Sequence, residues 1–230
     1  MKTILVFLFG ALFAAPFPQS QFLLERPGYV IHFDGRTRNA CWVYERLTEP
    51  PVPKDKKSRD RFRFVQDFSI PAPFRTSNDD FRNSGFDRGH LCPFADMPEH
   101  SMGDSYFLSN ISPQVPGFNR GIWLRLECYV RSLASRFEEL HVFTLPLFLP
   151  ELDPNGNRYV RYQVIGKRAV AVPTHFAKAI FAKSQEGIEV FVYLLPNREI
   201  GVAKPLEEYR TNLQTLEALS GLIFPEADSF

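Results

Sequence analysis

The chain has 230 residues, of which 44% are hydrophobic and 14% aromatic, which predicts one sizeable core and excludes both large-scale disorder and two independent cores. Its 23 Phe and 19 Pro favour a compact α+β domain over a helical bundle, because rings fill a core and prolines interrupt helices. The formal net charge is +1, so no global charge attracts a polyanion, and any nucleic-acid binding must depend on local clusters of arginine and lysine.

Residues 1–15 have the pattern of a secretory signal peptide. Lys2 precedes an apolar run from Ile4 to Phe13, and the small residues Ala14 and Ala15 follow it. The run is shorter than the roughly 20 residues that span a bilayer, and it lacks the Arg and Ser of a mitochondrial transit peptide. We expect residues 1–15 to be removed, with retention as an anchor as the alternative. Residues 16–230 should form a single domain that is secreted or periplasmic rather than mitochondrial, without stable membrane association.

Two β-rich runs, residues 29–34 and 40–47, flank a turn at Asp34-Gly35 and predict a hairpin of the framework. The connection over residues 49–63 then changes in composition to Pro, Lys, Asp and Arg. Its basic side chains either contact phosphates or only keep a loop in water, and the sequence leaves both readings open.

Three cysteines, Cys41, Cys92 and Cys128, form neither a Cys-x-x-Cys pair nor a zinc spacing with the five histidines. Each lies in an apolar neighbourhood, where a buried free thiol is more frequent than a disulfide. We therefore expect no zinc site, and the disulfide state stays open.

The centre of the chain is the motif Asp87-Arg88-Gly89-His90. On a strand, side chains two residues apart point to the same face, so Arg88 and His90 should look into one space. Residues 106–113 predict a second short strand, and a helix should begin near Asn119, with Glu127 and Arg131 beside its apolar stripe. The stripe consists of Ile122, Leu126, Val130 and Leu133. The sequence thus predicts a ββα hairpin that brings a base, an amide, a carboxylate and two cations together.

Each of these residues also has a purely structural explanation. Asn119 fits a helix N-cap, and Glu127 with Arg131 fits a solvated ion pair at i, i+4 spacing. Asp87 and Arg88 fit an ion pair at a strand end. Only the combination of these five residues with His90 favours phosphodiester cleavage.

Several segments resemble the DNA/RNA non-specific endonuclease family, most of all its endonuclease G branch. The likeness covers residues 86–91 and 106–116, then Asn119, Trp123, Leu126, Glu127 and Arg131, and further segments up to Ser220-Gly221-Leu222. It therefore extends over nearly the whole mature chain. The chain departs from the family at Thr144-Leu145-Pro146, which stands where Thr-Gly-Pro is usual, and at Cys92-Pro93-Phe94, which replaces smaller residues after the motif.

The resemblance implies an α+β, ββα-metal nuclease fold with a central antiparallel sheet flanked by helices. It also implies a sugar-non-specific endonuclease with one Mg²⁺, for which Mn²⁺ can substitute, bound by Asn119 and by Glu127 through water. His90 would be the general base, Arg88 and Arg131 would stabilise charge, and Asp87 would orient its neighbours. DNA and RNA are the expected substrates, and a homodimer is suggested. The alternatives are a phosphodiesterase of small nucleotides and a nucleic-acid-binding protein that has lost catalysis.

The remaining chain predicts scaffold. Four β-rich runs with turns at Asn155-Gly156, Gly166-Lys167 and Glu186-Gly187 indicate an antiparallel sheet, and they occupy residues 142–149, 159–172, 175–182 and 188–195. His175 is expected to be a core histidine rather than a metal ligand. A last helix should begin at Pro205 and end at Gly221.

Overall fold

A seven-stranded sheet forms the framework, with every neighbouring pair antiparallel and the strand order β1-β2-β3-β6-β11-β12-β13. Its strands are β1 (Gln21–Arg26), β2 (Tyr29–Asp34), β3 (Asn39–Leu47), β6 (Glu139–Leu147), β11 (His175–Ser184), β12 (Gly187–Pro196) and β13 (Arg210–Thr211). The computed structural model describes residues 20–51, 54, 59–201, 203–226 and 229. The predicted signal peptide therefore lies outside the described residues.

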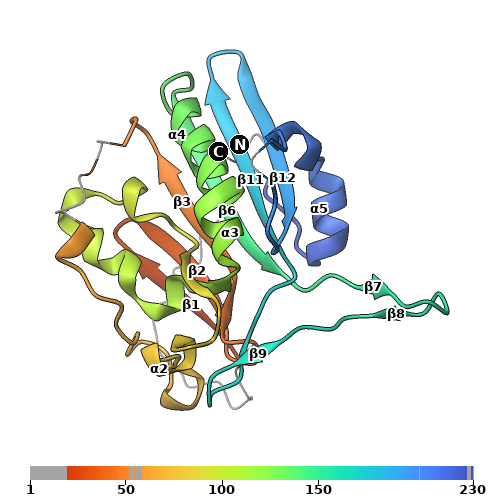
Figure 1. Ribbon diagram of the computed structural model, residues 1–230. Helices are drawn as coiled ribbons and strands as arrows, with labels where there is room; N and C mark the ends of the chain where they lie inside the picture. The colour runs from red at the N-terminus through yellow and green to blue at the C-terminus, as the bar shows by residue number, and fades with distance from the viewer. Residues whose placement is uncertain (1–19, 52–53, 55–58, 202, 227–228, 230) are drawn as a thin grey trace, which may run out of the picture.

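Helices cover the two faces of this sheet (Figure 1). On one face, α4 (Leu124–Leu133) packs its residues Leu126, Val130 and Leu133 onto a core that includes Leu140 and Ile180 of the sheet. On the other face, Leu216 of α5 (Leu213–Ser220) joins a second core, which includes Phe181. Strand β11 is a central strand between these two layers, so both of its faces are covered. Seven successive residues of β11 are buried, and all of them except Lys178 are apolar.

The predicted ββα unit consists of the strands β4 and β5 and the helix that leads into α4. Strand β4 (Asp87–His90) pairs with β5 (Ile111–Gln114), with His90 opposite Ile111. A short helix α3 (Pro116–Phe118) follows and continues through a π-helical turn, Asn119–Trp123, into α4. The second strand begins at 111 rather than at 106, because residues 99–110 form short 3₁₀ helices. The helix begins at Pro116, since proline fits the first turn and needs no donor there.

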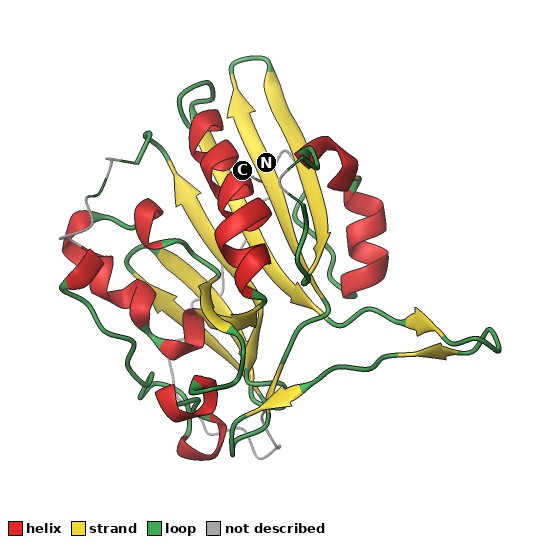
Figure 2. Ribbon diagram, in the orientation of Figure 1, coloured by secondary structure: helices red, strands yellow, loops and turns green. Residues whose placement is uncertain are grey.

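The other elements are short. They are α2 (Asn78–Phe81), the strands β7 (Glu151–Leu152), β8 (Arg158–Tyr159), β9 (Val164–Ile165) and β10 (Val170–Ala171), and 3₁₀ helices at Ala72–Phe74, Phe94–Asp96, Glu99–Tyr106, Leu108–Asn110 and Leu206–Tyr209. Strands β7 and β8 form an arm that projects away from the sheet (Figure 2).

Two sequence predictions about the bounds of secondary-structure elements are wrong. Residues 159–172 are not β-rich throughout: β9 and β10 pair across the predicted turn at Gly166-Lys167, where Gly166 has the left-handed φ of 66°, but residues 160–163 belong to no strand. The last helix does not begin at Pro205: a 3₁₀ helix and β13 come first, and Asn212 caps α5 by accepting a hydrogen bond from the Thr215 amide. Its predicted end at Gly221 is correct.

The three cysteines are free thiols, and only Cys92 is fully buried. Among the described residues, no helix combines the length and apolar character that a membrane crossing needs.

Gly89 is required by the packing of the β4–β5 hairpin. A Cβ at this position would overlap the side chain of Gln114, which is completely buried and cannot move into solvent. Overpacking of this kind typically costs about 1–3 kcal/mol. We expect Gly89→Ala to lower the free energy of unfolding by this amount in urea denaturation. Gly201→Ala is the matched control, because nothing lies near its added methyl; equal effects of the two substitutions would contradict this reading.

Candidate active site

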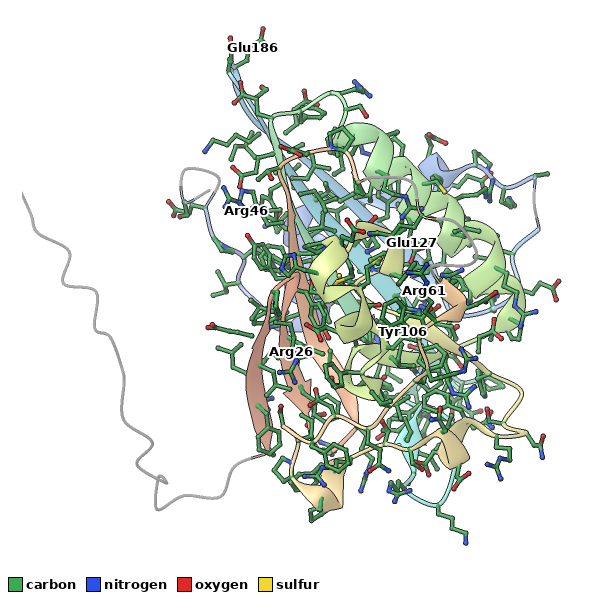
Figure 3. All side chains as sticks on the ribbon, turned by 90° about the vertical axis from the view of Figure 1, so that its left-hand side faces the viewer. Arg26, Arg46, Arg61, Tyr106, Glu127 and Glu186 are labelled. Carbon is green, nitrogen blue, oxygen red and sulfur yellow. The ribbon has the colours of Figure 1, made fainter. Side chains whose placement is uncertain are left out.

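A pocket of about 730 Å³ opens between the β4–β5 hairpin and the start of α4. Five of the predicted site residues line it, although they are up to 43 positions apart in the chain: Arg88, His90, Asn119, Glu127 and Arg131. Figure 3 shows Glu127 and Tyr106 near each other on this side of the molecule. The remaining lining is largely cationic and aromatic, with Lys54, Arg59, Arg120, Phe64, Phe94 and Tyr106. An anion is therefore the ligand class that this pocket favours.

Asp87 joins the strand to the helix that follows it. Its Oδ2 accepts hydrogen bonds from Asn119 Nδ2 at 2.9 Å and from Arg120 Nε at 2.8 Å, and its Oδ1 accepts one from Arg120 Nη2 at 2.6 Å. A carboxylate can only accept, so the Asn119 amide group is oriented with its NH₂ on Asp87 and its Oδ1 left as an acceptor. Arg120 rather than Arg88 is thus the ion-pair partner of Asp87.

Asn119 is not a helix N-cap. Its backbone is helical, with φ −57° and ψ −48°, whereas an N-cap has an extended backbone. It lies at the start of the π-helical turn, in which Gly121 leaves helical geometry at φ −106° and ψ −108°. Such π-helical turns occur frequently at functional sites, because they change the direction of the side chains.

His90 lies at the end of β4 against two aromatic rings. Its ring centroid is 5.5 Å from that of Phe64 and 5.2 Å from that of Tyr106. Its Nε2 atom is shielded from solvent and has no hydrogen-bond partner in the part of the chain described. Burial, and secondarily the charge of Arg59, lowers the pKa of His90 to about 3. The imidazole is therefore neutral over the physiological range and can accept a proton.

Arg88 shares the pocket with His90, as the strand periodicity predicts. Its guanidinium lies 5.5 Å from the Phe64 ring centroid and 5.6 Å from that of Phe81, and its Nη2 donates to the carbonyl oxygen of Asn78 at 3.2 Å. Burial lowers its pKa from the usual value, but an arginine stays charged at any physiological pH. The aromatic contacts fix a cation at the pocket wall.

Glu127 and Arg131 do not form the solvated ion pair that their spacing allows. Arg131 Nη1 instead donates to Asp96 Oδ1 at 3.1 Å, and the Asp96 side chain is 1% exposed. Burial raises the pKa of Glu127 to about 7, and the nearby charge of Lys178 partly offsets this effect. Arg131 therefore pairs with Asp96, while Glu127 and Arg131 line the same pocket and act on each other only through their charges.

Three charged residues near the pocket were not found from the sequence. Asp96 lies in a segment that reads as a loop, and Glu45 and Lys178 occupy strands in which every charge would be expected to face water. Lys178 is 1% exposed; its Nζ donates to Thr144 Oγ1 at 2.6 Å and lies 3.7 Å from Glu45 Oε1. Nothing in the local sequence signals this burial.

Lys54 and Arg59 come from the basic connection for which two readings were open, and they line the pocket. His175 does not: its Nδ1 contacts Thr174 Oγ1 at 3.0 Å, away from the pocket lining. Among the described residues, no group of three or more His, Cys, Asp or Glu side chains could hold a metal ion.

Comparison with known proteins gives a consistent result. A family model described as DNA/RNA non-specific endonuclease matches residues 10–228. The chain is 43% identical to human mitochondrial endonuclease G over 205 residues, which covers 88% of this chain and 69% of the relative. It is 40% identical to nuclease C1 of Cunninghamella echinulata var. echinulata, covering 87% and 81% of the two chains. A solved structure of the EndoG/EndoGI complex matches with a TM-score of 0.85 at 38% identity, over 90% of this chain and 87% of that one.

The burial of His90 should make the stability of the fold depend on pH. The unfolded state binds a proton on this histidine below about pH 6.5, and the native state binds it only near pH 3, so the unfolding free energy falls as pH falls between these values. The slope from one group is at most about 1.4 kcal/mol per pH unit. Urea titrations at several pH values should show a steeper dependence in the wild type than in His90→Ala, because His141 and His175, whose pKa values burial also lowers, contribute in both proteins.

His100→Ala is the control for this measurement, because His100 is exposed. It should keep the pH dependence of the wild type. An unchanged profile in His90→Ala would show that His90 is not buried in the neutral form.

Proposed function

This chain belongs to the DNA/RNA non-specific endonuclease family, and from that premise we propose how its pocket hydrolyses phosphodiester bonds. The family is one of metal-dependent nucleases with a ββα-metal fold, and DNA and RNA are its substrates. The observation that carries the mechanism is the unpartnered Nε2 of His90, which shares a cationic pocket with the amide of Asn119. A neutral base beside a phosphate-binding surface is what the attack of water on phosphorus requires.

His90 acts as the general base. Its pKa is lowered by burial, so the imidazole is unprotonated at neutral pH and its Nε2 is available to take a proton from the attacking water. A base with a pKa far below 7 accepts protons weakly in the free enzyme. A negatively charged phosphate in the pocket would raise this pKa, because an anion favours the imidazolium that forms during the reaction.

Mg²⁺ fits the donors of the pocket, because it prefers hard oxygen ligands and keeps several of its waters. Asn119 would hold it through Oδ1, which the hydrogen bond from Nδ2 to Asp87 leaves available, and Glu127 would hold its water. When bound, the ion supplies electrostatic stabilisation of the charge that develops on the phosphoryl oxygens. Mn²⁺ offers the same oxygen chemistry and should substitute.

The arginines bind the substrate phosphate. Arg88 is fixed over two rings and Arg131 is fixed by Asp96, so both cations are held in place before the substrate arrives. Preorganised charges of this kind stabilise a transition state without reorganisation. Asp87 does not react; it orients Asn119 through a 2.9 Å hydrogen bond.

Breadth of substrate follows from contacts of this type. A metal ion and arginines read phosphate and carry little information about the base or the sugar. DNA and RNA, single- or double-stranded, should therefore be cleaved, and binding should weaken as salt rises. Hydrolysis restricted to small nucleotides is the second candidate, and a dinucleotide substrate separates the two.

Location and assembly are also proposals. We propose export, on the basis of the signal-like residues 1–15, although several relatives are named as mitochondrial proteins. We propose a homodimer as well, which the exposed apolar side chains of the arm at residues 151–164 would favour, among them Leu152 and Val160. Cell fractionation and sedimentation velocity test the two proposals; a purely mitochondrial pool or a monomer at micromolar concentration would contradict them.

The mechanism predicts a defined pattern of losses. With Mg²⁺, the wild type should cut plasmid DNA and RNA, and EDTA should abolish both activities. His90→Ala should lower kcat by at least about 100-fold, because proton transfer contributes this much in general base catalysis. Asn119→Ala should reduce activity at low Mg²⁺ and recover part of it at high Mg²⁺, since it removes a ligand.

His175→Ala is the matched control, because this histidine lies away from the pocket, and it should cut at the rate of the wild type. A His90→Ala variant as active as the wild type would refute the assignment of the base. Cleavage of a dinucleotide without cleavage of plasmid would favour the small-nucleotide phosphodiesterase.

A further inference from the structure

Asp96 is a carboxylate beside the pocket that contacts no reacting group in the steps above and is linked to them only through Arg131. It follows the catalytic motif by six residues and forms the end of the short 3₁₀ helix Phe94–Asp96. Its side chain is 1% exposed, and its Oδ1 accepts a hydrogen bond from Arg131 Nη1 at 3.1 Å. Its Oδ2 has no hydrogen-bond partner within the described ranges. Burying an ionised carboxylate is costly, so the pairing with Arg131 decides whether its charge is tolerated.

The direction of the Arg131 side chain depends on its bond to Asp96. Its side chain is 20% exposed and lines the pocket, so it is neither a core residue nor a freely solvated one. Besides its bond to Asp96, the Arg131 side chain donates from Nη2 to Cys128 Sγ at 3.2 Å, one turn earlier on the same helix. A thiol is a weak acceptor and cannot fix a guanidinium. Asp96 is therefore the group that determines the direction of Arg131.

The cations behind Asp96 partly offset the cost of burying its charge. Burial raises the pKa of Asp96, and the charges of Arg131 and next Lys178 oppose this rise. Lys178 is held in place by Thr144 at 2.6 Å and by Glu45 at 3.7 Å, so it is a fixed positive charge behind the carboxylate. Two cations from different elements, α4 and β11, thus act on one buried anion.

We propose that Asp96 is a positioning residue of the nuclease reaction, which holds the guanidinium of Arg131 in the pocket for the substrate phosphate. This inference rests on the proposed function, because it gives Arg131 a phosphate to bind. An arginine held from behind loses little side-chain entropy when it binds, whereas one released into solvent must be ordered first. The opposing view is that Asp96 and Arg131 form an ion pair that serves the stability of the core alone.

A double-mutant cycle separates the two views. The four proteins are the wild type, Asp96→Asn, Arg131→Ala and the double variant, each assayed for kcat and KM on duplex DNA with Mg²⁺. A positioning role predicts that Asp96→Asn lowers kcat/KM by about tenfold in the wild type, the value of one charge-assisted hydrogen bond, and changes nothing once Arg131 is absent. A role in stability alone predicts the same small factor in both backgrounds.

Binding provides a second readout that does not require cleavage. Affinity for a short duplex is measured in EDTA as a function of salt. Loss of one phosphate contact lowers the slope of log affinity against log salt by about one. Asp96→Asn should share the reduced slope of Arg131→Ala, and the double variant should show no further reduction. A wild-type slope in Asp96→Asn would overturn the proposal.

The chain offers a matched control in Asp67, another buried aspartate paired with an arginine. Its Oδ2 lies 2.8 Å from Arg26 Nη2, its side chain is 2% exposed, and neither residue lines the active-site pocket. Asp67→Asn should lower the midpoint of thermal unfolding and leave kcat/KM and the salt slope unchanged. An equal loss of kcat/KM in the two aspartate variants would identify a general effect of destabilisation and overturn the proposal.

The experiments distinguish a failure of the proposed function from a failure of the positioning role of Asp96. A wild type that cuts no nucleic acid refutes the proposed function, and the binding cycle in EDTA still decides whether Asp96 acts through Arg131. If Asp96→Asn does not fold, Asp96→Glu takes its place in both cycles, because it keeps the charge and moves the carboxylate by one methylene. A loss that vanishes in the Arg131→Ala background supports the proposal with either variant, and one that persists refutes it.

Discussion

The hydrogen bonds of the Asp87 carboxylate are the contacts on which the rest of the site depends. They tie β4 to the π-helical turn that begins more than thirty residues later, through Asn119 and Arg120. The strand carries His90 and the helix carries Glu127 and Arg131, so this one side chain sets the distance between the two halves of the pocket. It also decides which end of the Asn119 amide faces a ligand. Asp87 therefore links the strand and the helix whose side chains line the pocket.

Burial shifts the pKa values of the groups that the proposed mechanism uses, and it acts in opposite directions on His90 and Glu127. It lowers the pKa of His90 to about 3 and raises the pKa of Glu127 to about 7, because in each case the charged form loses its hydration. The rings of Phe64 and Tyr106 create this environment around the histidine. Around the carboxylates, the cations Lys178 and Arg131 oppose it. The aromatic content of the chain thus serves the chemistry as well as the core.

Local sequence patterns predicted the elements correctly where residues adjacent in the sequence determine the backbone conformation. The hairpin at Asp34-Gly35, the ββα order and the stop at Gly221 depend on neighbours in sequence, and the structure has all three. The predictions of a β-rich run over residues 159–172 and of a helix start at Pro205 were wrong. Residues 160–163 belong to no strand although their composition favours one, and the capping residue Asn212 starts the last helix later in the chain.

The sequence by itself determined the family, the α+β class and the five side chains that line the pocket together, because the motif and its spacing fix chemical types on particular strands and helices. Only the tertiary structure decided their partners. Asp87 binds Asn119 and Arg120, Arg131 turns to Asp96, and Lys178 lies buried beside Glu45. Each of these pairs joins residues from different elements, and their energies depend on burial and on distances of a few ångströms. Such contacts arise when the layers pack, and no local pattern of residues encodes them.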